Sequence, residues 1–97
     1  MVIGVVRLTI HIHESQSLKD KRAVLRSLKA RIESRYKVAV AEVGPLQDRQ
    51  NGVLAIVCVS NNGRHADETM GHIVDFAMAN AGDGSVDNVE TEILHLG

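Results

Sequence analysis

The first segment of the chain, from Val2 to His13, alternates between apolar and polar residues. Its two sides carry different side chains: Val6, Leu8, Ile10 and Ile12 on one, Arg7, Thr9, His11 and His13 on the other. A period of two over this length, rich in β-branched residues, predicts a strand with one buried face. We expect Glu14-Ser15-Gln16 to turn the chain after this strand.

From Ser17 to Lys37 the apolar spacing becomes that of an amphipathic helix, which turns about 100° per residue. Ser17 is expected to cap this helix, and Asp20 places an acid in its positive first turn. The apolar stripe consists of Leu18, Leu25, Leu28 and Ile32, with Tyr36 at its edge and Val24 on the far flank. This stripe is predicted to pack on the core.

Two further apolar segments follow, separated by a polar loop. Val38 to Val43 predicts a short strand that ends at Gly44-Pro45, because proline lacks a donor and glycine permits the turn. Leu46 to Asn51 form the expected loop. Gly52 to Ser60 is an almost continuous apolar run, which is typical of a central strand covered on both sides. A partner chain could provide the second cover.

The C-terminal part of the chain predicts a second helix and a last strand. Residues 60–63 supply the turn and cap of a helix from about Arg64 to Ala81, and Gly82 is the expected stop. The stripe of this helix is Ala66, Met70, Ile73, Val74 and Ala77, with Asp67, Glu68 and Asp75 turned outward. Val86 to Leu96 predicts a strand whose Glu90 and Glu92 suit a sheet edge.

The predicted order is strand, helix, strand, strand, helix, strand. With right-handed crossovers and both helices on one face, this order gives an α+β, ferredoxin-like βαββαβ fold. Its sheet is four-stranded and antiparallel, with the first and third strands in the middle. The length of 97 residues predicts a single domain over residues 1–97. One face of the sheet should stay open.

Positive charge is concentrated in the first predicted helix. The segment from Ser17 to Lys37 holds eight of the eleven Lys and Arg residues and has a net charge of +6, whereas the rest of the chain has a net charge of −7. Four residues at spacings of three and four form a basic ridge beside the apolar stripe: Lys19, Arg22, Arg26 and Lys29. Glu33 interrupts the far end of the ridge, and Arg31 and Arg35 lie on the opposite flank.

The single cysteine and the lengths of the apolar runs bear on the cellular location of the protein. The lone Cys58 sits in an apolar run and predicts a small buried side chain, not a disulfide or a thiolate zinc site. No convincing signal peptide precedes Arg7 and His11, and no apolar run approaches the roughly 20 residues of a membrane span. We therefore expect a cytoplasmic protein that does not engage a membrane.

Three blocks at characteristic spacing give the chain a family resemblance. They are Ser17-Leu18-Lys19-Asp20-Lys21-Arg22, Val38-Ala39-Val40-Ala41-Glu42-Val43, and Val59-Ser60-Asn61-Asn62 with Arg64-His65-Ala66. The chain resembles the YlxP-like family of small bacterial proteins, a domain of unknown function, over nearly its whole length.

The resemblance implies a ferredoxin-like fold. Its members are often encoded beside translation initiation and ribosome-maturation genes, which implies association with RNA or the ribosome. It supplies no catalytic residue. Arg49 stands here where the family pattern often has a tryptophan, so an aromatic role at that position is not carried over.

The basic charge leads to a functional hypothesis, a non-enzymatic binding module for RNA or the ribosome. A row of cations on one helix face can neutralise phosphates with little sequence discrimination. The expected nucleic-acid-binding residues are Lys19, Lys21, Arg22, Arg26 and Lys29. The alternative is a solvated helix face, or a face paired with the acids of the second helix.

Other functions remain open on weaker grounds. A homodimer could bury the open sheet face, or that face could serve a self-associating regulatory domain for a small ligand. RNA stacking on the sheet is disfavoured because aromatic residues are scarce. An acylphosphatase-like hydrolase would need a glycine-containing phosphate loop after the first strand, where this chain has Glu14 and no glycine.

No cofactor or metal is expected. His11 and His13, with His95 on the last strand, could supply metal ligands, but no carboxylate or thiolate is clearly placed beside them. We interpret His11 and His13 as polar residues of the sheet surface.

Overall fold

The computed structural model describes residues 1–14 and 17–97. Of the expected turn, Ser15 and Gln16 lie outside the described residues. The elements of the chain are β1 (Val2–Ile12), α1 (Leu18–Arg35), β2 (Ala39–Gly44), β3 (Asn51–Ser60), α2 (Gly63–Ala79) and β4 (Gly84–His95). Every element foreseen from the hydrophobic pattern is present, and its ends differ from the prediction by two residues or fewer.

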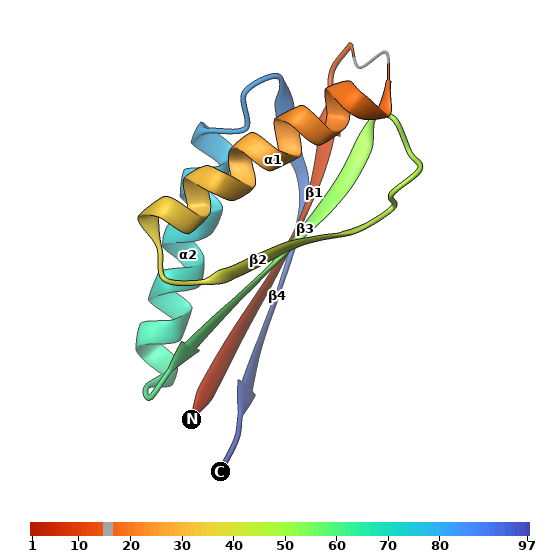
Figure 1. The fold of residues 1–97 in the computed structure, drawn as a ribbon. Coiled ribbons are helices and arrows are strands. Elements are labelled where there is room, and N and C mark those ends of the chain that lie inside the picture. The colour runs from red at the N-terminus through yellow and green to blue at the C-terminus, as the bar shows by residue number, and fades with distance from the viewer. Residues whose placement is uncertain (15–16) are drawn as a thin grey trace.

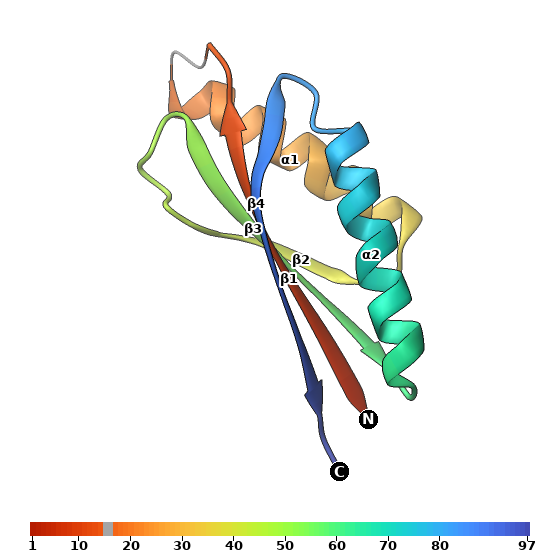
Figure 2. The same cartoon turned by 180° about the vertical axis from the view of Figure 1, so that it is seen from behind.

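The four strands form one antiparallel sheet in the order β2-β3-β1-β4. Both helices cover the same face of this sheet, as the two opposite views show (Figures 1 and 2). This is the ferredoxin-like fold that the sequence predicts, with β1 and β3 in the middle. The N-terminus and the C-terminus leave the sheet at the same end (Figure 1).

Side-chain caps fix the start of each helix. The Ser17 hydroxyl accepts a hydrogen bond of 3.1 Å from the Asp20 N–H, and the Asn62 side chain accepts from the N–H groups of Arg64 and His65. Such caps satisfy donors that the first helical turn leaves unpaired. Helix α2 ends at Ala79, two residues before the predicted end, and Asn80 closes it with its side chain bonded to a backbone carbonyl.

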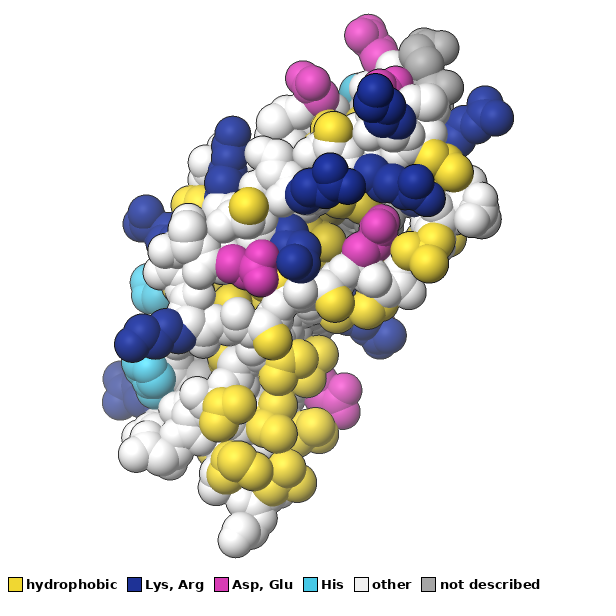
Figure 3. Space-filling model, in the orientation of Figure 1, with side chains coloured by type: hydrophobic (Ala, Val, Ile, Leu, Met, Phe, Trp, Pro, Cys, Tyr) yellow, Lys and Arg dark blue, Asp and Glu magenta, His cyan; other side chains and the backbone are white. Residues whose placement is uncertain are grey.

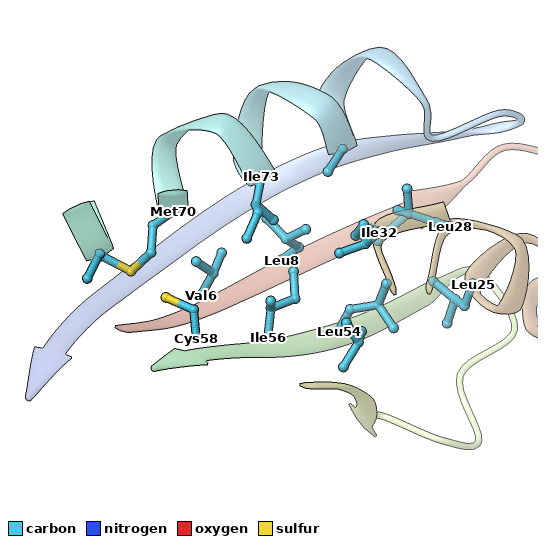
Figure 4. Close-up of a cluster of buried hydrophobic side chains, with 14 of the residues drawn as sticks. Val6, Leu8, Leu25, Leu28, Ile32, Leu54, Ile56, Cys58, Met70 and Ile73 are labelled. Carbon is cyan, nitrogen blue, oxygen red and sulfur yellow. The ribbon is translucent and has the colours of Figure 1, made fainter. Parts of the chain in front are cut away.

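The core lies between the sheet and the two helices (Figure 4). β1 contributes Val6 and Leu8, α1 contributes Leu28 and Ile32, and α2 contributes Ile73, each at most 1% exposed. Cys58 is also buried, as predicted, beside Met70 of α2 (Figure 4). The apolar stripes read from the sequence are therefore the surfaces that pack together.

The other face of the sheet carries apolar side chains that remain exposed. Val59 of β3 is 67% exposed and Leu94 of β4 is 40% exposed, and both are paired in register with Ile3 of β1. β3 is a central strand as expected, but no described residue supplies the second cover. In the described part of the chain, no helix combines the length and apolar character needed to cross a membrane.

Candidate nucleic-acid interface

The basic ridge lies along the outer side of α1, the side turned away from the core. Lys19, Arg22 and Arg26 are exposed and Lys29 is half-buried. The apolar stripe beside them positions the helix, because Leu25, Leu28 and Ile32 are at most 2% exposed against the sheet. In Figure 3, Lys and Arg side chains gather over α1, with Asp or Glu side chains between them.

Two arginines of the ridge have no carboxylate partner among the described residues. Arg22 and Arg26 form no ion pair, whereas Lys29 Nζ lies 3.3 Å from Oε1 of Glu33, one turn further along the same helix. Within residues 1–14 and 17–97, no ion pair joins α1 to the acidic helix α2. The ridge is therefore not neutralised by the second helix.

Lys21 lies elsewhere, and its assignment to the interface is wrong. The residue is 0% exposed. Its Nζ donates hydrogen bonds to the carbonyl oxygens of Pro45 at 2.8 Å, Leu46 at 3.3 Å and Asn51 at 3.2 Å. An ammonium group has three donors, so these carbonyls occupy all of them. Lys21 cannot reach an external phosphate from this position.

The sequence contained a signal for this burial. Lys21 precedes Leu25, Leu28 and Ile32 at the spacing of four, three and four that defines the apolar stripe. Helical periodicity thus places Lys21 in the centre of the stripe, while the ridge residues lie to one side. Lys21 was assigned to the surface because it is charged, although its position in the helix is that of a buried residue.

A hollow of about 260 Å³ opens beside the ridge. Its charged lining comes from Arg22, Arg26 and Lys29 of α1 and from Glu42 of β2, and its apolar lining from Leu25 and Leu54. Glu42 and Leu54 are paired in register across β2 and β3. The hollow therefore combines three cations, one carboxylate and two leucines.

Glu42 is the residue of this site that the functional reading of the sequence missed. It is half-buried, and its Oε2 is buried with no hydrogen-bond partner among the described residues. Period two along β2 puts Glu42 on the same side as buried Val40, which faces the helices. That alternation was the available signal.

The flank of α1 opposite the ridge is engaged within the molecule. The Arg35 guanidinium carbon lies 5.2 Å from the ring centroid of Phe76, and Arg31 donates a long hydrogen bond of 3.5 Å to the Asn80 carbonyl. A guanidinium over an aromatic face is held by the ring quadrupole. These cations help to join α1 to α2.

Of the three histidines considered as metal ligands, His95 lies far along the sheet from His11 and His13. His11 pairs with Ser85 in the β1–β4 ladder, whereas His95 pairs with Val2 at the other end. His11 and His13 do lie side by side, with ring centroids 5.0 Å apart. His11 Nδ1 is 3.0 Å from Asn51 Oδ1, and no group of three potential ligands occurs among the described residues.

Comparison with known proteins finds relatives by sequence. A family model described as "Protein of unknown function (DUF503)" matches residues 3–91. The "Uncharacterized protein YlxP" of Bacillus subtilis (strain 168) is 27% identical over 75 residues, which make up 77% of this chain and 82% of that protein. These matches agree with the resemblance seen in the sequence blocks.

Solved structures share the fold at low sequence identity. The designed ferredoxin-fold protein LFR1 1 is 10% identical with a TM-score of 0.56, over 100% of this chain and 89% of that one. Rv0793 from Mycobacterium tuberculosis is 20% identical with a TM-score of 0.51, over 99% and 95% of the two chains. SnoaB, a cofactor-independent oxygenase from Streptomyces nogalater, is 12% identical with a TM-score of 0.50, over 98% and 92%. The likeness extends to the fold alone.

Proposed function

Because this chain belongs to the DUF503 family of YlxP-like proteins, whose function is unknown, we propose a role from its own surface: a non-enzymatic module that binds RNA. The interface is the basic ridge, Lys19, Arg22, Arg26 and Lys29. The observation that carries the proposal is that Arg22 and Arg26 lie one turn apart, exposed and without a carboxylate partner among the described residues. Lys21 is excluded from the interface by its burial.

The physical basis is the release of counterions from the phosphate backbone. Each phosphate that a cation neutralises frees condensed counterions, so the logarithm of the affinity falls by roughly 0.7 to 0.9 per unit of log salt concentration. With its ridge cations engaged, the protein would lose affinity steeply as salt rises. Backbone contacts of this kind give little sequence discrimination. RNA or the ribosome is chosen as the partner because the family resemblance implies it, and a cytoplasmic location is part of the same proposal.

The test is a titration of a structured ribosomal RNA fragment at several salt concentrations. The double variant Arg22→Ala/Arg26→Ala should bind more weakly and should show a salt slope that is shallower by about 1.5. The matched control is Lys37→Ala/Arg49→Ala, which removes the same charge from exposed residues outside the ridge. Absence of binding by the wild type at low salt, or equal loss in both double variants, would contradict the proposal.

The non-enzymatic part of the proposal has its own support. The family carries no assigned catalytic activity. The segment after β1 contains Glu14 and no glycine, so it lacks the composition of a phosphate-cradling loop. Turnover of a generic acylphosphate by the purified protein would contradict this part.

The same proposal includes a homodimer formed through the open sheet face. RNA is a poor occupant of this face, because Glu90 and Glu92 lie on it and β1 and β3 present no Phe, Tyr or Trp there. Its apolar side chains and its mixed charges suit a second copy. Arg7 lies 3.3 Å from Glu90 while Glu92 has no ion pair in the described chain, so a two-fold partner can add an opposite charge on each side.

Sedimentation velocity over a range of concentrations tests the dimer. Val59→Lys places a charge in the apolar part of this face and should shift the protein towards the monomer. Met78→Lys is the matched control, because Met78 is 56% exposed on α2, away from the sheet. A wild type that is monomeric at all concentrations, or equal behaviour of both variants, would rule out this interface.

A further inference from the structure

Glu42, which lines the hollow beside the ridge, has a polar atom that needs a donor. Oε2 of Glu42 is buried without a hydrogen-bond partner in the described residues. Buried carboxylate oxygens in folded proteins are nearly always bonded, because an unmet acceptor loses its hydration without compensation. Glu42 is therefore prepared to accept a hydrogen from something that enters the hollow.

The remaining lining restricts what can enter. Arg22 and Arg26 offer fork-shaped donors to an anion, and the buried side chains of Leu25 and Leu54 close the hollow from within. The volume of about 260 Å³ is slightly below the range of about 300 to 1,000 Å³ typical of pockets for drug-sized ligands. The matching ligand is small and combines an anionic group with an N–H or O–H donor.

We propose that the hollow holds one nucleotide unit of a bound RNA strand, with its phosphate on Arg22 and Arg26 and a donor hydrogen on Oε2 of Glu42. The donor is either the ribose 2′-hydroxyl or a base N–H, which share the same hydrogen-bonding chemistry. This inference rests on the proposed RNA-binding function and adds a specific contact to it.

Removing the carboxylate gives opposite results under the two possible roles of Glu42. If Glu42 were a spectator among cations, its removal would make the surface around the ridge more positive and strengthen RNA binding. If Oε2 accepts a hydrogen bond from the nucleotide, Glu42→Met should weaken binding about tenfold or more, since hydrogen bonds to charged groups are the strong ones. The direction of the change decides between them.

A matched control distinguishes the loss of a negative charge near the ridge from the loss of a hydrogen bond to the nucleotide. Glu33→Met also removes one carboxylate beside the ridge, but Glu33 pairs with Lys29 and does not line the hollow. We expect Glu33→Met to leave RNA affinity unchanged or raised. Glu42→Gln, which keeps a neutral acceptor, should retain more affinity than Glu42→Met. Circular dichroism and thermal unfolding of each variant establish that it is folded.

The probes are one single-stranded RNA and the 2′-deoxy strand of equal sequence. If the 2′-hydroxyl is the donor, the wild type prefers RNA and Glu42→Met loses that preference. If a base N–H is the donor, Glu42→Met weakens both strands equally. Unchanged or tighter binding by Glu42→Met, with Arg22→Ala/Arg26→Ala still defective, would overturn this inference alone. No RNA binding by the wild type would overturn it together with the proposed function.

Discussion

Lys21 Nζ donates a hydrogen bond of 2.8 Å to the carbonyl oxygen of Pro45, which ties the first turns of α1 to the loop between β2 and β3. The same ammonium bonds the carbonyls of Leu46 and Asn51. One buried side chain thus satisfies backbone acceptors on both sides of this loop. The loop borders the strand that carries Glu42, so Lys21 supports the position of the proposed site without contacting a ligand.

Loss of this ammonium should destabilise the fold. Lys21→Ala leaves three partly buried carbonyls without their donor and creates a cavity, and we expect the free energy of unfolding to fall by about 3 kcal/mol. Lys21→Met keeps the apolar stem and should lose about 2 kcal/mol. Urea unfolding measures both values. Lys19→Ala, an exposed residue nearby on the same helix, is the control and should change stability by less than about 0.5 kcal/mol. A full loss of RNA binding by Lys21→Met at unchanged stability would contradict the structural role.

Gly52 lies close to Leu25, a residue that lines the hollow, and this packing leads to a second prediction. A Cβ on Gly52 would meet a methyl carbon of Leu25, so Gly52→Ala must displace α1 or force Leu25 from its rotamer. We expect a loss of about 1 to 3 kcal/mol in the free energy of unfolding. Gly71→Ala is the matched control, because a Cβ there meets nothing within 4 Å and α2 gains helix propensity. It should stabilise the protein by about 0.5 to 1 kcal/mol. Equal effects of both substitutions in urea unfolding would contradict the packing described.

The contribution of Asp48 to the stability of the β2–β3 loop depends on pH. The backbone N–H of Gln50, then the backbone and side-chain N–H groups of Asn51, hold the pKa of this carboxyl below its ordinary value of 3.8. A depressed folded-state pKa favours the ionised form, so its stabilisation is present above pH 3.8 and is lost as pH falls through the lower folded pKa.

The comparison is between the wild type and Asp48→Asn, which keeps one acceptor oxygen but does not titrate. Urea midpoints measured from pH 7 down to about pH 2 should converge at the acidic end, because only the wild type loses stabilisation from this group there. Asp67→Asn controls for removal of one exposed negative charge. A constant difference in midpoint between wild type and Asp48→Asn would contradict this account of the loop.

Most of the fold could be predicted from the periodicity of hydrophobic residues. The alternation in β1 and the 3.6-residue spacing in α1 and α2 identified the buried faces, because each element packs its apolar side on the core. The helix starts at Ser17 and Asn62 followed from local capping chemistry. These are interactions over a few residues, and the sequence displays them directly.

The candidate site was predicted in part. The ridge residues Arg22 and Arg26 were identified from helical spacing, and the structure places them at the surface without carboxylate partners among the described residues. Lys21 was assigned to the wrong environment because its charge was given more weight than its position in the stripe. Glu42 was overlooked because its importance depends on which helix covers β2.

The sequence by itself determined the order of elements, the buried stripes and the concentration of positive charge on α1, since each depends on spacing along one segment. The tertiary structure alone decided that Lys21 meets carbonyls 24 to 30 residues away and that Glu42, with an unmet acceptor, lines the same hollow as Arg22 and Arg26. The physical reason is that hydrogen bonding and desolvation of a buried charge depend on groups brought close by folding. The spacing of residues within one segment does not show which distant groups will become neighbours.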